Sequence, residues 1–174
     1  MRARGRILFV LGIVLLPLLG VSSAAATSYV YATAWADQKL DEYKASTGGE
    51  LTKFGSVDAI DSEPWYMAMT ANLHSPRGLH LESLYEITFT GKDLIAFSVG
   101  THGYLVHKTA AQGGQLPAGN RPYGIALSPD DKNAYVVDQG PGFGGTGALW
   151  IYNISPSGTI KPHSPASIPL GTTP

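Results

Sequence analysis

Three segments of the chain repeat one pattern of residue types at a nearly constant spacing. In each segment a leucine is followed by an aromatic residue three positions later, a glycine nine positions later and an aliphatic residue eleven positions later. The copies are Leu40, Tyr43, Gly49 and Leu51; Leu94, Phe97, Gly103 and Leu105; and Leu149, Tyr152, Gly158 and Ile160. Repeats with a period of this size form stacked or radially arranged units, because one unit cannot bury its own apolar face. The sequence therefore predicts a repeat architecture.

The third repeat predicts four short strands. Residues 124–127, 134–137 and 149–154 are mostly apolar, and the last two segments contain the β-branched and aromatic residues that favour strands. Proline and aspartate in residues 128–132 favour a turn, as do serine and glycine in residues 155–158. The prolines around residues 167–170 suit an edge strand, where a missing N–H group does no harm. Four antiparallel strands of this kind are typical of one blade of a β-propeller.

The other two repeats fit the same frame. Tyr31, Tyr85 and Tyr135 take the same place in the second strand of their repeats. The predicted fold is all-β, with propeller blades of four antiparallel strands and about two and a half to three blades present. The propeller domain covers residues 27–174, with repeats at about 29–63, 64–121 and 122–174. The first repeat enters at its second strand.

An incomplete ring has a physical consequence. Propellers close with typically four to eight blades, which protects the edges of their strands. Fewer than three blades would leave apolar faces and open edges exposed. Two explanations follow: the chain is a fragment of a longer protein, or it completes a ring by self-association through its open blade edges. We favour the fragment.

Residues 1–26 have the pattern of a signal peptide. Arg2, Arg4 and Arg6 precede an apolar run, and Ala24 to Ala26 supply the small residues that signal peptidase requires, with cleavage near Ala26. The alternative is an uncleaved anchor, but the run is at the short end for a bilayer span. The expected location is secreted, periplasmic or extracellular, and the expected partner is an extracellular ligand or a cell-envelope component. No membrane contact beyond the export signal is expected.

Composition narrows the possible partners. The chain has no cysteine, so it has neither disulfide bonds nor thiolate metal sites. It contains 12 basic and 13 acidic residues, and three of the basic residues are the arginines of the leader. The remaining chain is mildly acidic and has no basic run, which argues against nucleic acid as a partner.

The sequence PYGIALSPDDKNAYVVD, followed by GALWIYNISPSGTIKPHSPASIPLGTTP, resembles the lactonase-type seven-bladed propellers with YVTN repeats. The segment TSYVYATAWADQKLDEYKASTGGELTKFGSV is similar in its second and third strands. The resemblance covers essentially residues 29–174. It implies the propeller fold, and it implies either a binding or scaffold module or a lactone hydrolase similar to 6-phosphogluconolactonase. Whether the protein is an enzyme stays open, and the binding module is our preferred interpretation.

One loop is the best candidate for ligand contacts. Residues 138–147 are glycine-rich and lengthen the link between the second and third strands of the third repeat. The resemblance implies that this link lies on the ligand-facing side of the propeller. Glycine allows close backbone approach and polar side chains can bind a ligand, which gives the candidate residues Asp138, Gln139, Gly142, Gly144 and Gly145. The alternative is an ordinary hairpin loop. The loop does not match a phosphate-binding motif.

Catalytic and metal-binding constellations are weak. The five histidines are His74, His80, His102, His107 and His163, and the propeller frame places none of them near the central channel. The insertion at residues 72–80 could bind an anion or a metal, although a solvated loop is favoured. Asp41 and Glu42, like Asp58 and Asp61, are explained by a strand face and a turn. No nucleophile elbow is present, so no catalytic residue, metal site or cofactor is predicted.

Overall fold

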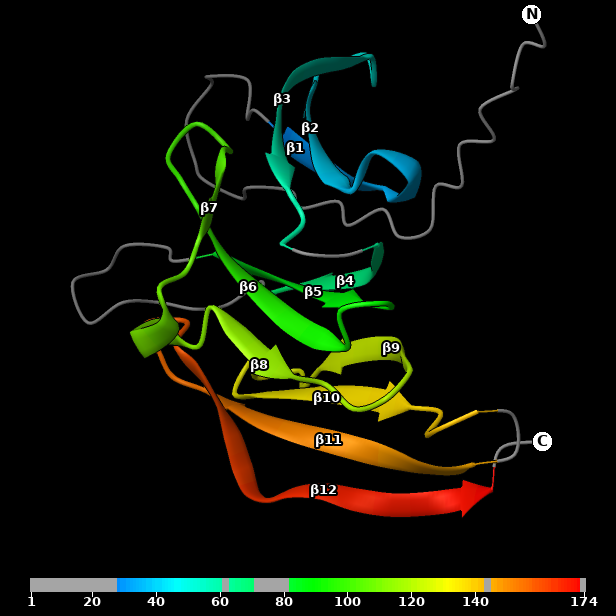
Figure 1. Cartoon of the computed structure of the whole chain (residues 1–174). Coiled ribbons are helices and arrows are strands. Elements are labelled where there is room, and N and C mark those ends of the chain that lie inside the picture. Colours follow the sequence, from blue (N-terminus) through cyan, green and yellow to red (C-terminus); the bar gives the residue numbers. More distant parts are fainter. Residues whose placement is uncertain (1–27, 61–62, 71–81, 143–144, 173–174) are drawn as a thin grey trace, which may run out of the picture.

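The computed structural model describes residues 28–60, 63–70, 82–142 and 145–172. These residues form three antiparallel sheets that are stacked one upon another along the chain (Figure 1). We call the sheets the first, second and third blade. The leader at residues 1–26 and the insertion at residues 72–80 fall outside the described residues. No helix in the described part of the chain is long and apolar enough to cross a bilayer.

The first blade has three strands in the order β1-β2-β3. Their bounds are β1 (Ser28–Ala34), β2 (Lys39–Ala45) and β3 (Leu51–Asp58), with a short 3-10 helix η1 (Trp35–Asp37) between the first two. Tyr31 pairs with Glu42 and Thr33 pairs with Leu40 across β1 and β2. Among the described residues β1 carries the repeated tyrosine and lies at an edge of its sheet, in the place of the second strand of the other repeats.

The second blade differs from the prediction in its outer strand. Its strands are β4 (Pro64–Met69), β5 (Ser83–Thr88), β6 (Asp93–Val99), β7 (Leu105–His107) and β8 (Gln115–Pro117). Both β7 and β8 pair with β6, so two short strands share the place expected for one. The 3-10 helix η2 (Ala110–Gln112) separates them. Thr109 and Gln112 form a capping box there, which satisfies backbone donors where the strand is interrupted.

The third blade has the four predicted strands in the order β12-β11-β10-β9. Their bounds are β9 (Pro122–Leu127), β10 (Asn133–Asp138), β11 (Thr146–Ile154) and β12 (Ile160–Thr172). The proline-bearing strand lies at the outer edge, as predicted. It is much longer than expected, at 13 residues, and it follows β11 through two register shifts.

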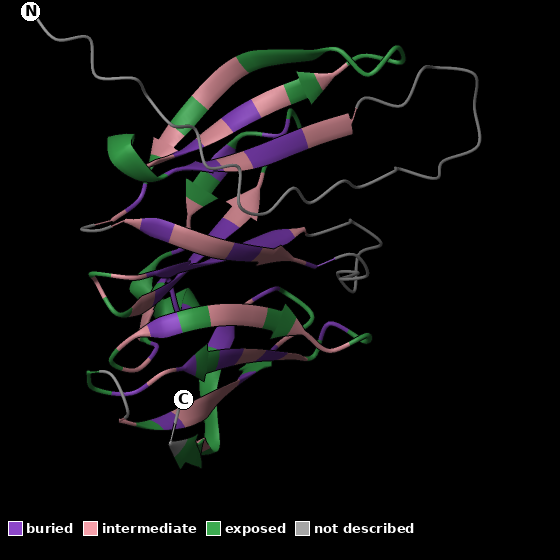
Figure 2. Ribbon diagram, turned by 90° about the vertical axis from the view of Figure 1, so that its right-hand side faces the viewer, coloured by how far each residue is buried: buried purple, intermediate pink, exposed green. Residues whose placement is uncertain are grey.

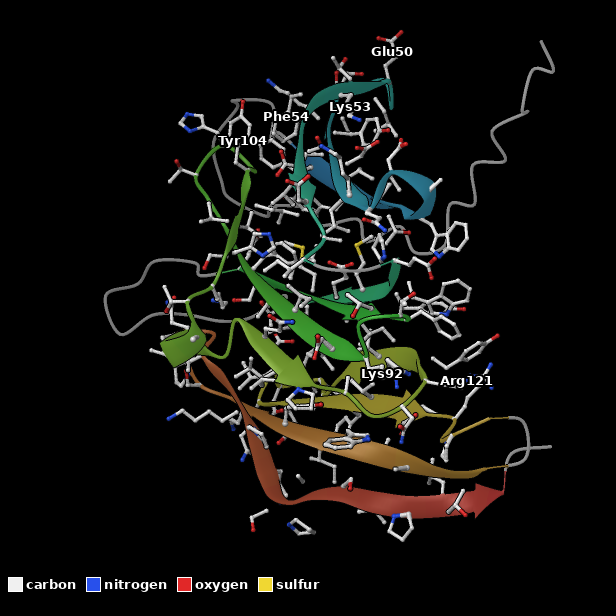
Figure 3. All side chains as sticks on the ribbon, viewed as in Figure 1. Glu50, Lys53, Phe54, Lys92, Tyr104 and Arg121 are labelled. Atoms are coloured by element: carbon white, nitrogen blue, oxygen red, sulfur yellow. The ribbon has the colours of Figure 1, made fainter. Side chains whose placement is uncertain are left out.

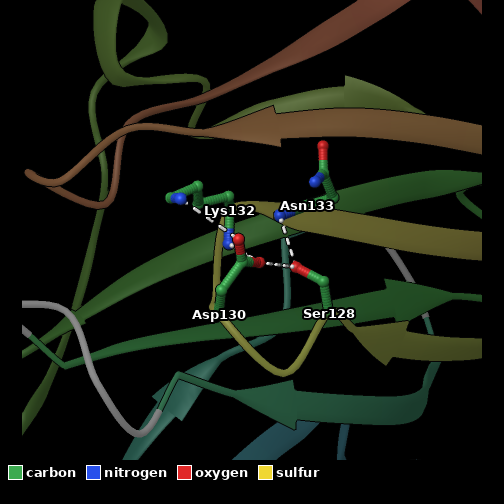
Figure 4. Close-up of polar contacts among 4 residues, drawn as sticks. All are labelled: Ser128, Asp130, Lys132 and Asn133. Carbon is green, nitrogen blue, oxygen red and sulfur yellow. Dashed lines mark hydrogen bonds and ion pairs between the residues drawn. The ribbon is translucent and has the colours of Figure 1, made fainter.

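The turn between β9 and β10 is built by side chains (Figure 4). Ser128 Oγ donates to Asp130 Oδ1 at 2.7 Å, and the Lys132 N–H donates to the same oxygen at 3.2 Å. The Asn133 N–H donates to Ser128 Oγ at 3.0 Å. The hydrogen bonds that Asp130 accepts, that from the Ser128 hydroxyl first and then those from Lys132, lower the pKa of Asp130 to about 2. The predicted turn chemistry of this segment is confirmed.

The hydrophobic core lies between the blades. One cluster joins the first and second blades and is centred on Tyr31, Leu84 and Phe97. The other joins the second and third blades and includes Tyr85 and Tyr152. Figure 2 shows buried segments along the strands, and exposed residues both at the connections and on strands such as β3 and β12. Each sheet therefore buries its apolar face against the next sheet, as the blades of a propeller do.

Candidate functional site

The candidate site is a pocket at the boundary between the second and third blades. Its volume is about 420 Å³, and it is lined by Phe89, Thr90, Lys92, Asn120, Arg121, Pro141 and Gly142. Three connections contribute these residues: the β5–β6 turn, the β8–β9 link and the start of the glycine-rich β10–β11 loop. The pocket therefore includes part of the loop that the sequence singled out.

Two cationic side chains face this pocket. Figure 3 shows Lys92 on the β5–β6 turn and Arg121 on the neighbouring β8–β9 link. Lys92 is exposed and has a φ of 62°, a left-handed conformation that the tight turn after β5 requires. Backbone hydrogen bonds stabilise this turn. The Lys92 N–H donates to the Thr88 carbonyl oxygen at 3.2 Å, and the Ala118 N–H donates to the Lys92 carbonyl oxygen at 2.8 Å.

Arg121 is held more firmly than Lys92. Its Nη1 donates to the Gly142 carbonyl oxygen at 3.1 Å. Its guanidinium carbon lies 5.7 Å from the centre of the Phe89 ring, within the range of a cation–π contact. The arginine thus connects the glycine-rich loop to the aromatic wall of the pocket.

That wall belongs to a cluster of aromatic side chains. The ring centres of Trp65 and Phe89 are 5.3 Å apart, and those of Tyr66 and Tyr123 are 6.0 Å apart. Such separations are typical of favourable aromatic pairs. Trp65 and Trp150 pack against the core between the blades, as the sequence suggested for these tryptophans. Trp35 lies in η1 and is exposed.

Asp138 connects the loop to the β8–β9 link through hydrogen bonds. Its side chain is buried, and Oδ1 accepts the Arg121 N–H at 2.7 Å and the Gly140 N–H at 3.0 Å. Its carboxyl group also lies so close to Gly119 that a Cβ at that glycine would be 2.3 Å from it. Through these contacts the Asp138 carboxylate holds the β8–β9 link beside the loop. Asp138 therefore positions two of the three connections that line the pocket.

The other candidate residues of the loop have different surroundings. Gly142 lines the pocket and has a φ of 68°, with nothing within 4 Å of a Cβ. Gly145 packs against the Pro141 carbonyl, because a Cβ there would be 2.3 Å from that oxygen. The Gln139 N–H donates to the Arg121 carbonyl oxygen at 3.0 Å. Gly144 lies outside the described residues.

The histidines lie away from the pocket. His102 is in the exposed turn before β7, His107 is in β7, and His163 is in β12. His107 Nε2 is 2.8 Å from the Asp58 carbonyl oxygen, and His163 Nδ1 is 3.0 Å from Asn153 Oδ1. His74 and His80 lie outside the described residues. The described part of the chain holds no cluster of three or more histidine, aspartate or glutamate side chains suited to a metal ion.

The carboxylates that the sequence analysis considered form contacts within the first blade and at its boundary with the second blade. Asp41 Oδ1 forms a salt bridge with Lys53 Nζ at 2.6 Å, and Asp58 Oδ1 forms one with Lys39 Nζ at 3.1 Å. Glu42 is buried between blades, and its Oε1 accepts the Leu105 N–H at 2.6 Å. Burial raises the pKa of Glu42, and the Leu105 N–H opposes that rise. Asp61 lies outside the described residues.

Sequence reasoning missed three charged residues. Lys92 and Arg121 lie on two different connections of the second repeat, and only folding brings these connections together. Glu86 lies in the middle of β5 and is fully buried, and neither carboxylate oxygen has a hydrogen-bond partner among the described residues. Burial raises the pKa of Glu86 to about 8. The sequence signal was available, since a glutamate flanked by Tyr85 and Ile87 interrupts an apolar strand.

Comparisons with solved structures show the same fold. The chain superposes on a provisionally assigned 6-phosphogluconolactonase of Bacteroides uniformis with a TM-score of 0.60 and 22% identity, over 84% of this chain and 39% of that one. For the periplasmic gluconolactonase of Pseudomonas aeruginosa the TM-score is 0.55 and the identity 18%, over 83% and 37%. A protein from Lactobacillus plantarum gives 0.54 and 20%, over 85% and 39%.

These likenesses establish a lactonase-type β-propeller fold, and at such low identity they establish the fold alone. The chain spans about two fifths of the length of the structures it matches. No protein-family model matches the chain, and no curated protein matches it.

Proposed function

We propose that this protein is an exported propeller module that binds a small anionic ligand in the pocket between the second and third blades. The observation that carries the proposal is the meeting of Lys92 and Arg121 at one pocket. The ammonium and guanidinium groups provide donors for a carboxylate or a phosphate. None of the described residues that line the pocket carries a negative charge.

The remaining walls suit an organic anion. Phe89 offers an aromatic face, while Thr90 and Asn120 offer groups that bind hydroxyls. Gly142 lets a ligand approach the backbone closely, because its site has open space. A polyhydroxylated acid combines these features. The names of two structural neighbours, a 6-phosphogluconolactonase and a gluconolactonase, support sugar acids as the class.

The pocket favours binding over turnover. Lactone hydrolysis needs a general base within hydrogen-bond reach of a water molecule, and the described pocket residues include no carboxylate or histidine. Export, inferred from the leader, places the ligand outside the cytoplasm. A binding or scaffold role follows for this module.

The test is a calorimetric titration of the purified chain with 6-phosphogluconate, gluconate and glucose. The two acids are expected to bind and neutral glucose is not. Arg121→Gln and Lys92→Gln are each expected to weaken the binding of 6-phosphogluconate about tenfold, which corresponds to the loss of one charge-assisted hydrogen bond. Lys44→Gln, on the first blade, removes the same charge and is expected to leave binding unchanged. Equal binding of glucose, or equal losses in all three variants, would reject the proposal.

The alternative is a lactone hydrolase, which the names of the structural neighbours favour. It is tested on the same preparation by following the acid released from glucono-δ-lactone at constant pH. We expect hydrolysis at the rate of buffer alone. Hydrolysis well above that rate, lost in Arg121→Gln, would replace the binding role by the hydrolase.

A further inference from the structure

A row of four aromatic side chains extends from the pocket along the boundary between the second and third blades. Phe89 lies in the pocket wall, and its ring centre is 5.3 Å from that of Trp65. The Trp65 ring centre is 6.1 Å from that of Tyr66 and 6.3 Å from that of Tyr123. Each of these distances lies within the range of favourable aromatic pairs. We call these four residues the aromatic row.

The row is built from both blades. Trp65 and Tyr66 belong to β4, whereas Tyr123 belongs to β9. These are the first strands of their blades, each lies at an edge of its sheet, and the two strands contact each other (Figure 1). Further along β9, Ile125 and Leu127 pack against the core between the same two blades. Both walls of the row therefore belong to blades that the described chain contains.

Tyr123 offers the open surface of the row. Its side chain is 45% exposed, whereas Trp65 and Tyr66 are partly buried. The Tyr123 ring is tilted by 48° from that of Trp65 and by 55° from that of Tyr66, so neither neighbour stacks flat upon it. Because these neighbours already hold the ring, it loses little freedom when a ligand binds. The row is thus a preformed aromatic surface beside a cationic pocket.

The pocket also contains a hydroxyl group whose proton is already used. Thr90 Oγ1 donates to Glu63 Oε2 at 2.6 Å. The oxygen of Thr90 can therefore only accept from a ligand, which must offer a donor such as a hydroxyl group. The Glu63 carboxylate places a negative charge beside this hydroxyl, so the acid group of a ligand belongs at Lys92 and Arg121.

We propose that the pocket and the aromatic row together bind an acidic oligosaccharide. One uronic acid residue places its carboxylate at Lys92 and Arg121, and the next sugar ring packs on Tyr123. The inference rests on the proposed function, since it uses the same anionic site. The apolar face of a sugar ring suits an aromatic surface, and the sugar hydroxyls supply the donor for Thr90.

The length of the ligand follows from the position of Tyr123. This side chain does not line the pocket, and only the row connects the two. A single sugar acid in the pocket gains nothing from the open ring, whereas a chain of sugars reaches both. An aromatic acid would suit the row but lacks the hydroxyl donor that Thr90 requires.

Calorimetric titration of the purified full chain with galacturonic acid, trigalacturonic acid and neutral maltotriose tests this inference. The trimer is expected to bind about tenfold more tightly than the monomer, as for one added aromatic contact. Maltotriose is expected to show no binding, because it lacks the carboxylate.

Substitutions separate the two parts of the site. Tyr123→Ala is expected to reduce the affinity for the trimer to that for the monomer, and to leave the monomer unaffected. Tyr123→Leu keeps an apolar side chain without a ring face, and the same result is expected. Arg121→Gln is expected to weaken both ligands alike. Tyr104→Ala is the matched control, since Tyr104 is 51% exposed and pairs with Phe54 at 4.9 Å, away from the pocket.

The possible outcomes distinguish the inference from the proposed function. The inference is overturned if the trimer binds no more tightly than the monomer, if both Tyr123 variants weaken the two ligands equally, or if maltotriose binds like the trimer. The proposed function survives the first two results, provided that the monomer still binds and Arg121→Gln weakens it. Failure of galacturonic acid, gluconate and 6-phosphogluconate to bind the wild type would reject both. Circular dichroism verifies that each variant is folded.

Discussion

The Tyr31 hydroxyl donates a buried hydrogen bond to the carbonyl oxygen of Gly103, which lies 72 residues further along the chain in the turn of the next blade. The turn holds Gly103 at a φ of 79°, a conformation that other residues rarely adopt. Burial raises the pKa of Tyr31 well above its usual range, so the hydroxyl keeps its proton as a donor. Two positions of the repeat thus form one link between blades.

Removal of the second such link is expected to destabilise the fold. Tyr85→Phe deletes the hydroxyl that donates to Gly158 and leaves a buried carbonyl without that donor. The expected loss in the free energy of unfolding is about 1–3 kcal/mol, measured by urea denaturation. Tyr135→Phe removes a hydroxyl that donates to none of the described residues, and it is expected to change stability by less than about 0.5 kcal/mol. Equal losses in the two variants would contradict the link.

The glycine turns provide a matched pair of substitutions. Gly103→Ala adds a methyl group that would lie 2.3 Å from the Tyr29 ring, whereas Gly49→Ala adds it where nothing lies within 4 Å. Both glycines have positive φ values, so each alanine carries a strain of about 1–2 kcal/mol. Thermal denaturation is expected to show a clearly larger loss for Gly103→Ala. Similar melting temperatures for the two variants would mean that the close approach of Tyr29 is unimportant.

The buried carboxyl of Glu86 predicts an unusual pH dependence. Burial raises its pKa from 4.5 to about 8, so the folded chain retains a proton that the unfolded chain releases. The folded state binds more protons between about pH 4.5 and 8, and its stability therefore falls as the pH rises through this window. The slope attributable to Glu86 approaches about 1.4 kcal/mol per pH unit in the middle of the window. Glu42, whose pKa burial also raises, adds a contribution of the same sign.

Denaturation of Glu86→Gln from pH 4.5 to 8 measures this contribution. The amide cannot ionise, so the variant is expected to lose most of the slope and to exceed the wild type in stability near pH 8. Glu50→Gln is the control, because Glu50 is exposed and its substitution is expected to leave the slope unchanged. Parallel stability curves for the wild type and Glu86→Gln would disprove the assignment.

Asp138 is expected to control the shape of the pocket. Asp138→Ala removes the acceptor for the Arg121 and Gly140 N–H groups, which lie 2.7 and 3.0 Å from Oδ1. Hydrogen bonds to a charged group contribute about 1.5–3 kcal/mol each, so we expect a loss of at least about 2 kcal/mol together with weaker ligand binding. Asp138→Asn keeps an acceptor oxygen and is expected to lose less. Urea denaturation and the calorimetric titration measure the two effects.

The local pattern of the sequence was sufficient for the strands and turns. Period, apolar runs and turn residues predicted each strand of the third blade, because these signals act within one repeat. The split of the outer strand of the second blade into β7 and β8 was not predicted. It depends on a capped turn at Thr109 and Gln112 and on Gly113, where a Cβ would lie 2.0 Å from the Ile160 carbonyl oxygen of the third blade. That contact exists only after the blades have packed.

The sequence by itself determined the repeat, the order of the strands and the positions of the tyrosines and glycines that recur in each unit. Only the tertiary structure decided which of these positions meet. Tyr31 and Gly103 belong to different repeats, and Lys92 and Arg121 lie on different connections of the second repeat. The tertiary structure also decided the environment of each charge: Asp138 became a support for the loop, and Glu86 became a buried acid. Residue spacing governs contacts along one strand or turn, whereas burial and pairing between blades depend on how the sheets stack.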